Sequence, residues 1–317
     1  MSVRETIGVD LGGTKMLIGV LDAERNVLWE SNERSTGQEE AGLVDLLERE
    51  ISEALRARPD AAAVGLGVPA TIDRETGTAI AAVNLPIDDL PIRDLIAERV
   101  KLPVFLDNDA NMAMLAEHLY GAARGSENAL MITVGTGIGG GLVIGGELYR
   151  GSRGGGAELG HVVMEVDGDP CQGNCPGHGH AETIASGNAL GREGRAAAER
   201  APDSALGRLA AEGAEVDGRA VTAAAIAGDE VAIGVVELVG RRIGLLLSGL
   251  ANIFEPQVMV VGGGVIAAGE LLLAPAREVV WEQTLRPMNE TPVVAAELGP
   301  DAGMIGAAAM ARLELNA

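Results

Sequence analysis

The sequence lacks the features of a membrane protein and of a nucleic-acid-binding protein. No apolar run approaches the ~20 residues that a membrane-spanning helix needs, and the chain opens into a strand pattern without the basic flank and apolar core of a signal peptide. Basic residues are scarce: 24 stand against 46 acidic ones, only Lys15 and Lys101 are lysines, and the formal net charge is −22. A field of this sign repels nucleic acid and anionic lipid. We therefore expect a soluble, cytoplasmic protein that binds neither nucleic acid nor membranes.

Cysteine and histidine are equally rare, yet they gather in one stretch. Of the two cysteines and four histidines, only His118 lies outside residues 158–182. Glycines and two prolines interrupt any helix or strand there, so a loop rich in thiol and imidazole groups is expected. This donor set is typical of a structural zinc site. Two alternatives remain open. A disulfide would need an oxidising compartment, and the two cysteines could instead be buried free thiols. Cys171 and Cys175 do not have the spacing of a CxxC pair, so their spacing alone does not identify a metal site.

The order of predicted elements repeats along the chain. Residues 6–34 and 129–150 each read as a strand, a glycine-rich turn and two further strands. A length of 317 residues also suits two domains better than one core. We therefore expect two halves built on one plan. Further helices are predicted at 39–58, 92–100, 110–120, 268–284 and 302–315, further strands at 61–68, 104–106, 257–261 and 292–297, and mainly helical structure from 187 to 253.

Both glycine-rich turns have the composition of a phosphate-binding corner. In the first, bare amides and the hydroxyl of Thr14 can face phosphate oxygens while Asp10 holds a magnesium ion; Thr136 repeats this chemistry in the second half. Ordinary hairpin turns are one alternative. A dinucleotide site is another, because residues 135–140 fit GxGxxG and residues 262–267 fit its terminal-Ala form. The first of these leads into a strand, whereas a dinucleotide motif opens a helix.

Three carboxylates have a functional and an ordinary interpretation. Asp109 follows a predicted strand, where it can be a catalytic base or the N-cap of the helix at 110–120. Glu158 and Glu182 flank the Cys/His stretch and could be solvated surface residues. His118 lies in a predicted helix without an evident partner and is taken as a structural or surface residue.

Together these segments resemble the ROK family of repressors, open reading frames and sugar kinases, within the actin-like ATPase superfamily. The likeness covers essentially the whole chain. The matching segments are DLGGTK at 10–15 and GTGIGGG at 135–141 for the two phosphate motifs, DNDAN at 107–111 for the catalytic ENDAN, ELGH at 158–161 for ExGH, and Gly262–Gly264 for the adenosine loop.

The resemblance implies a set of site residues. Asp109 becomes the general base. The implied sugar contacts are Gly67, Asn84, Asn108, Asp109, Glu158, His161 and Glu182. The implied contacts to nucleotide and magnesium are Asp10, Gly12, Gly13, Thr14, Lys15, Thr136, Gly137, Gly262, Gly263 and Gly264.

The zinc motif departs from the family pattern CxCGxxGCxE. Here the first two cysteines are four positions apart, and His180 replaces the last cysteine when the runs are aligned on Glu182. The implied ligands are His161, Cys171, Cys175 and His180, with His178 in reserve.

The implied fold is α/β, with two ribonuclease-H-like domains of the actin-like ATPase type and a cleft between them. Residues 1–120 would form the first domain, with the last helix at about 301–317 packing back on it, and residues 121–300 the larger second domain with the zinc loop. The implied activity is phosphorylation of glucose at O6 by ATP, with Mg²⁺ and a structural Zn²⁺, in a homodimer or homotetramer.

Alternatives within the family remain open at this stage. They include N-acetylmannosamine, fructose and allose kinases and a glucokinase that uses polyphosphate. A non-catalytic sugar sensor is less favoured because Asp109 and both phosphate loops are intact. The repressor branch carries a helix-turn-helix ahead of the first strand, for which we expect no room before Thr6.

Overall fold

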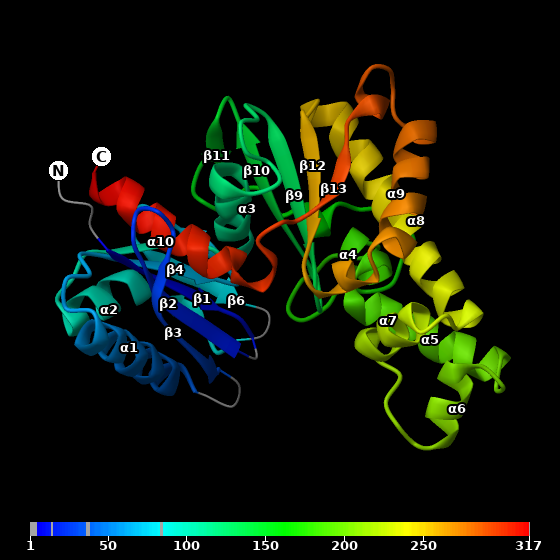
Figure 1. The fold of residues 1–317 in the computed structure, drawn as a ribbon, viewed down its shortest axis with the longest axis horizontal. Helices are drawn as coiled ribbons and strands as arrows, with labels where there is room; N and C mark the ends of the chain where they lie inside the picture. The colour runs from blue at the N-terminus through cyan, green and yellow to red at the C-terminus, as the bar shows by residue number, and fades with distance from the viewer. Residues whose placement is uncertain (1–4, 14, 36–38, 83–84, 317) are drawn as a thin grey trace.

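The computed structural model describes residues 5–13, 15–35, 39–82 and 85–316. Thr14 and Asn84, two of the predicted site residues, lie outside the described residues. Figure 1 shows two groups of strands and helices side by side, with the last helix lying over the first group. Within the described residues, no helix is both long and apolar enough to cross a membrane.

The first sheet has the order β3-β2-β1-β4-β8. β1 (Thr6–Leu11), β2 (Lys15–Leu21) and β3 (Val27–Arg34) are antiparallel neighbours, whereas β4 (Val64–Val68) and β8 (Val104–Asn108) run parallel to β1. Every residue of β4 is buried, as expected for a strand covered on both faces. α1 (Glu40–Ala57) and α2 (Ile92–Val100) pack on this sheet, and α10 (Ala302–Leu315) packs on β1 and β4.

Glycine allows α10 to approach the sheet closely. A Cβ atom on Gly8 would lie 2.1 Å from the carbonyl oxygen of Met304, and one on Gly65 would lie 1.9 Å from that of Ala307. No side chain fits in such a gap, so these two strand positions need glycine for helix packing.

The second sheet repeats the plan with the order β11-β10-β9-β12-β13. β9 (Ala129–Val134), β10 (Ile138–Ile144) and β11 (Glu147–Tyr149) are antiparallel neighbours, and β12 (Val258–Gly262) and β13 (Val293–Ala295) run parallel to β9. The repeated plan and the α/β fold class are therefore confirmed. The remaining elements are α3 (Asp109–Tyr120), α4 (Ala181–Ala185), α5 (Gly187–Arg200), α6 (Ala205–Ala211), α7 (Gly218–Ile226), α8 (Glu230–Phe254), α9 (Glu270–Gln283) and the 3₁₀ turns η1 (Leu159–His161), η2 (Gly264–Ala268), η3 (Met288–Glu290) and η4 (Gly299–Asp301).

A small third sheet was not predicted. β5 (Ala70–Asp73), β6 (Thr78–Ala82) and β7 (Asp88–Leu90) form an antiparallel meander directly after β4. These strands have three to five residues each, which is too short for a clear period-2 pattern.

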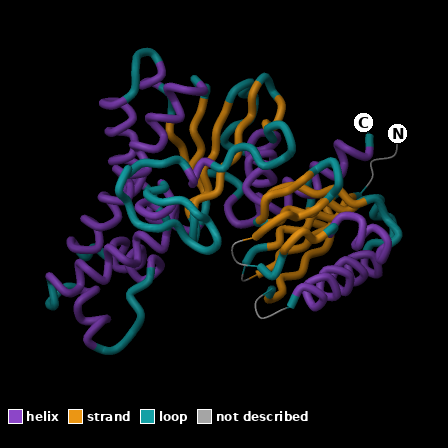
Figure 2. Tube along the Cα trace, turned by 180° about the vertical axis from the view of Figure 1, so that it is seen from behind, coloured by secondary structure: helices purple, strands orange, loops and turns teal. Residues whose placement is uncertain are grey.

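α3 lies between the two five-stranded sheets and packs on both α10 and β10. Nearly all of this helix is buried, from Ala110 to Glu117. The junction of β8 and α3 is therefore held from both sides. At the right of Figure 1, α8 and α9 lie beside the second sheet, and α5, α6 and α7 form a group of helices below them; Figure 2 shows the same group from behind. The domain bounds themselves stay a prediction.

Candidate active site

Three parallel strands bring site residues to one edge of the first sheet. Asp10 on β1 pairs in register with Gly67 on β4, and Gly67 pairs with Asp107 on β8. The carboxyl ends of parallel strands meet at the same edge. Asp109 follows two residues later, and a Cβ atom on Gly67 would lie 3.5 Å from its Cα atom. Gly67 therefore lies next to the predicted base.

The carboxylates of Asp10 and Asp109 both have raised pKa values. Burial, reinforced by the negative charge of Asp109, raises the pKa of Asp10 to about 7. Burial likewise raises the pKa of Asp109 to about 6; the Ala110 amide opposes this rise and the charge of Glu158 adds to it. Because excess negative charge at this point is unfavourable, a divalent cation bound here would be stabilised.

Asn108, and not Asp109, is the N-cap of α3. The side-chain oxygen of Asn108 accepts hydrogen bonds from the amides of Ala110 and Asn111, at 2.9 and 3.2 Å. Asp109 is the first helical residue, and its Oδ1 accepts only from the Ala110 amide among the described residues. The interpretation of Asp109 as the helix cap is therefore wrong. Asn108 is an implied sugar contact, but its side-chain oxygen is used in the cap. Its amide nitrogen donates to the carbonyl of Ala70 at 3.4 Å.

The first glycine turn is a closed hairpin end. The Gly12 amide donates to the Lys15 carbonyl at 2.8 Å, and the hydroxyl of Ser35 donates to the Gly12 carbonyl at 2.6 Å. Gly12 and Gly13 are partly exposed, and Lys15 is exposed. The described part of the turn thus lies at the strand end that carries Asp10.

The second glycine turn meets the third glycine segment and the start of α5. The Gly187 amide donates to the Gly135 carbonyl at 2.7 Å, and a Cβ atom on Gly263 would lie 2.5 Å from the carbonyl of Val134. Gly263 also has a φ of 84°, which favours glycine. Thr136 is exposed at the tip of this turn. The segments 135–137 and 262–264, far apart in sequence, therefore lie next to each other at the ends of β9 and β12.

Four of the five clustered Cys and His residues converge. The ligand atoms of His161, Cys171, Cys175 and His180 all lie within 4.8 Å of one another. The two Nδ1 atoms are 3.1 Å apart, and each of the three sulfur–nitrogen contacts measures 3.6 Å. Around a tetrahedral zinc ion, two nitrogens would be about 3.3 Å apart and nitrogen and sulfur about 3.5 Å. The donor set and its spacing therefore fit zinc.

His178 lies outside this cluster. Its side chain is exposed, and its backbone forms an isolated bridge with Pro170. The cluster contains His180, which is buried and precedes α4. The order of preference implied by the resemblance, with His180 ahead of His178, agrees with this placement.

Glu158 and Glu182 occupy different environments. Glu158 is exposed, and its Oε2 lies 4.0 Å from Nε2 of His161. Glu182 is 9% exposed, and its Oε2 accepts from the Ile138 amide at 2.8 Å. One oxygen of Glu182 therefore serves the second glycine turn, and a Cβ atom on Gly137 would collide with it. Although its side chain is 45% exposed, the surrounding protein removes part of the water around the carboxylate and so raises the pKa of Glu158, an effect that His161 opposes.

Two residues beside the predicted base, Asp107 and Arg150, were not identified from the sequence. Asp107 is fully buried and accepts from Arg150 Nε at 2.5 Å. Asp107 lies inside the DNDAN segment, so its strand-end position was the available signal; Arg150 offered none.

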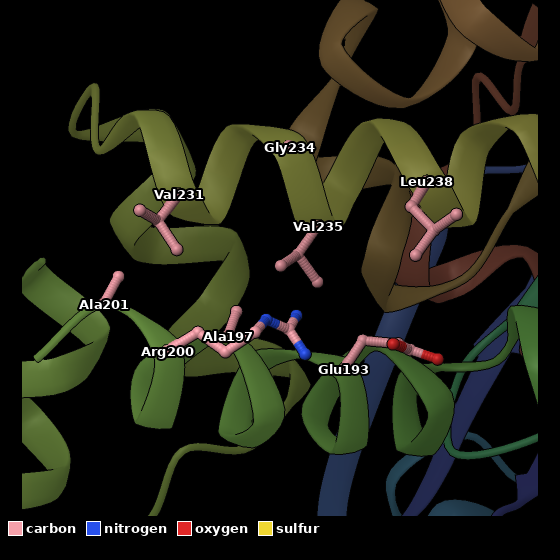
Figure 3. Close-up of a pocket in the computed structure, with 8 residues that line it drawn as sticks. All are labelled: Glu193, Ala197, Arg200, Ala201, Val231, Gly234, Val235 and Leu238. Atoms are coloured by element: carbon pink, nitrogen blue, oxygen red, sulfur yellow. The ribbon is translucent and has the colours of Figure 1, made fainter.

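A pocket in the second group of elements lies apart from these residues. α5 and α8 line it, and Val235 and Leu238 of α8 face Glu193 and Arg200 of α5 across the space between the two helices (Figure 3). Its lining, within the described chain, includes none of the predicted site residues. We assign it no role.

Comparison with known proteins agrees with this arrangement. A model of the ROK family matches residues 6–314. The glucokinase of Streptomyces coelicolor is 37% identical over 315 residues, 97% of this chain and 97% of that enzyme. A ROK family glucokinase from Streptomyces griseus, solved with glucose and AMPPNP, has a TM-score of 0.88 at 37% identity and covers 98% of this chain and 99% of its own. The xylose repressor of Caldicellulosiruptor bescii is 28% identical over 89% of this chain and 71% of its own length.

Proposed function

The chain belongs to the ROK family and is a hexokinase-type phosphotransferase, and from this premise we propose that it transfers the γ-phosphoryl group of ATP to O6 of glucose, with Asp109 as the general base. The observation that carries the proposal is the position of Asp109. Its carboxylate starts α3 at the edge of the first sheet, has a pKa raised to about 6, and is not used as the helix cap.

Asp109 acts on the sugar hydroxyl. Above its pKa the carboxylate accepts the proton of the primary hydroxyl, and the oxygen attacks the γ-phosphorus in line with the leaving β-phosphate oxygen. A positioned base contributes about 10²- to 10⁴-fold. The larger part of catalysis is positioning and charge neutralisation, because phosphoryl transfer needs little covalent help from the protein.

The glycine turns supply the donor site. Gly13 and Gly137 leave amides uncovered by side chains, which suits close contact with phosphate oxygens. Magnesium, held near Asp10, would neutralise charge that develops on the phosphates. The surface formed by segments 135–137 and 262–264 supports a role for Gly262–Gly264 in binding adenosine.

Zinc is assigned a structural role. Four protein donors in tetrahedral spacing leave no coordination position for water, which is the arrangement of structural sites. The ion would fasten the loop that carries Glu158 at one end and Glu182 at the other.

Glucose is preferred over other hexoses in this proposal because the glucokinases compared above resemble the chain over nearly its full length. Hydrogen bonds to sugar hydroxyls discriminate strongly between epimers, since a wrong epimer leaves buried polar groups unpaired. A second candidate, a repressor role, is weakened by the net charge of −22, which opposes DNA binding.

A coupled assay tests the proposal. Formation of the sugar phosphate is followed with glucose, mannose, fructose, allose and N-acetylmannosamine, each with ATP and with polyphosphate, and the product is identified by NMR. We expect glucose 6-phosphate and ATP to be the preferred pair. A higher kcat/KM for N-acetylmannosamine would overturn the assignment to glucose, and turnover with polyphosphate alone would overturn the assignment of the donor.

A further inference from the structure

A fully buried carboxylate connects the two sheets next to the predicted base. Asp107 is 0% exposed at the end of β8, two residues before Asp109. Its Oδ2 accepts from Arg150 Nε at 2.5 Å, and its Oδ1 accepts from Asn111 Nδ2 at 2.9 Å and from the Asn108 amide at 2.8 Å. Asp107 therefore holds the first turn of α3 and, at the same time, a residue outside the first sheet.

Arg150 belongs to the second sheet's side of the molecule. It follows β11, the edge strand of that sheet, and opens the loop that runs to Glu158. The Arg150 carbonyl accepts from the Gly156 amide at 2.9 Å, so residues 150–156 form a compact loop. The ion pair thus connects the strand end that carries Asp109 to the loop that carries Glu158.

A second contact holds the same loop. The Arg74 amide, in the turn between β5 and β6, donates to the Arg153 carbonyl at 3.3 Å. The Arg74 guanidinium lies 3.9 Å from Asp107 and pairs with Glu314 at 2.6 Å. Gly154 has a φ of 114°, and a Cβ atom there would lie 2.5 Å from the Ile72 carbonyl, so the loop lies directly against the small sheet. The loop is therefore attached to the first half of the chain at two points.

A buried carboxylate needs a partner of opposite charge. An unpaired buried charge is strongly unfavourable, whereas a hydrogen-bonded ion pair is tolerated without adding much net stability. An ion pair of this kind serves to fix geometry. The Arg150 side chain is 21% exposed and Asp107 is inaccessible, so solvent screens the pair little.

We propose that Asp107 and Arg150 are positioning residues of the phosphotransfer site, which set the distance between Asp109 at the start of α3 and Glu158 at the end of the loop that Arg150 opens. Neither residue is assigned a contact with substrate. The proposal rests on the proposed function for its kinetic consequence, and on geometry alone for the attachment of the loop.

The test compares three variants with a matched control. Arg150→Met removes the charge and keeps a long apolar side chain. Arg153→Met makes the same change in the same loop, where the side chain is exposed and only the backbone is used. Asp107→Asn/Arg150→Met removes both charges, and Arg150→Lys keeps the charge without the guanidinium geometry.

We expect Arg150→Met to lower kcat/KM for the sugar about 10- to 100-fold, because displacements of about 1 Å at a phosphotransfer site cost on this order. KM for ATP should stay unchanged, since the glycine turns are not attached to this loop. The double variant should recover the midpoint of thermal unfolding, because it buries no unpaired charge, while its kcat/KM stays low. Arg150→Lys should be intermediate, and Arg153→Met should match the wild type.

The double variant separates positioning from stability. If its kcat/KM recovered together with its thermal midpoint, the pair would be merely structural and the proposal would be wrong. A folded Arg150→Met with the kinetics of Arg153→Met would also overturn it.

Hydrogen exchange supplies a readout that does not need turnover. In Arg150→Met, amides of residues 151–157 and 108–111 should exchange faster together, with no change in Arg153→Met. This result would stand even if the wild type failed to phosphorylate any sugar, an outcome that would refute the proposed function alone. Unchanged exchange in both segments would refute the attachment.

Discussion

Glu182 accepts a hydrogen bond from the backbone amide of Ile138, with 2.8 Å between Oε2 and the nitrogen. Its other oxygen faces the sulfur of Cys171 at 3.7 Å. One carboxylate therefore joins the Cys/His loop to the strand that begins right after the second glycine turn. A disturbance in the Cys/His loop should reach the ATP side of the site as well as the sugar side.

Glu182→Ala should raise KM for ATP about 2- to 10-fold, the equivalent of one lost hydrogen bond, and lower kcat/KM for glucose by a larger factor. The physical reason is that the Ile138 amide loses its acceptor and the adjoining turn loosens. Initial rates measured with both substrates varied would separate the two effects. Glu165→Ala, an exposed glutamate in the same loop, is the control. An unchanged KM for ATP would show that the turn holds its shape without Glu182.

Elemental analysis is expected to find one zinc ion per chain in the wild type. Cys175→Ala and His180→Ala should each abolish zinc binding. With three donors left, the loop loses its anchor, and kcat/KM for glucose should fall on the order of 100-fold. His178→Ala changes an exposed histidine three residues after Cys175 and should keep both zinc and activity. Full activity in a protein stripped of metal by chelation would contradict a structural role for zinc.

Asp109→Asn should reduce kcat about 10²- to 10⁴-fold while glucose still binds, because the amide cannot accept the proton. The helix should remain intact, since Asn108 supplies the cap. The raised pKa of Asp109 means that folding favours its protonated form. The stability that the protonated carboxyl contributes below about pH 4 is lost as the pH rises through 6. The thermal midpoint at pH 8 should therefore not fall.

Calorimetric titration with glucose and unfolding followed by circular dichroism would check these expectations. Asp94→Asn, which alters another aspartate in the first turn of a helix, is the control. Near-normal turnover in folded Asp109→Asn would exclude Asp109 as the base.

The dependence of kcat/KM on pH should show an acid limb near pH 6. A base is active only when deprotonated, and burial raises the pKa of Asp109 to about 6. Below that pH the rate should fall tenfold per pH unit. Rates for glucose from pH 4.5 to 8 would establish the limb. A midpoint near 3.8, the ordinary value of an aspartate, would show that the ionising group is not buried in the way described.

Predictions from the sequence were most accurate where residues close together in the chain determine the backbone conformation and the chemistry. The glycine turns at 10–15 and 135–137 were placed correctly at strand ends, and the repeated strand order followed from the two similar openings. Glycine, a short hydroxyl side chain and a preceding strand constrain such turns locally. The Cys/His cluster could be predicted equally well, because its members lie within twenty residues of one another in the sequence.

Predictions failed where a shift of one residue or a distant contact decides the outcome. Asn and Asp are both good helix caps, so the sequence did not distinguish Asn108 from Asp109; the extended backbone of Asn108 did. The pairing of Asp107 with Arg150 spans 43 positions and depends on how the two sheets face each other. The meander β5–β7 is too short to be visible in a hydrophobic pattern.

The packing of α10 on β1 has a consequence for folding during synthesis. The hydroxyl of Thr6 donates to the carbonyl of Ala308, 302 positions later, and the glycines at 8 and 65 leave space that only this helix fills. Synthesis of this distance takes about 15 to 60 s at ordinary ribosomal rates. For that time, one face of the earliest sheet to emerge stays without its cover. The first sheet to be made is thus the last to be finished, and the second sheet can form before it.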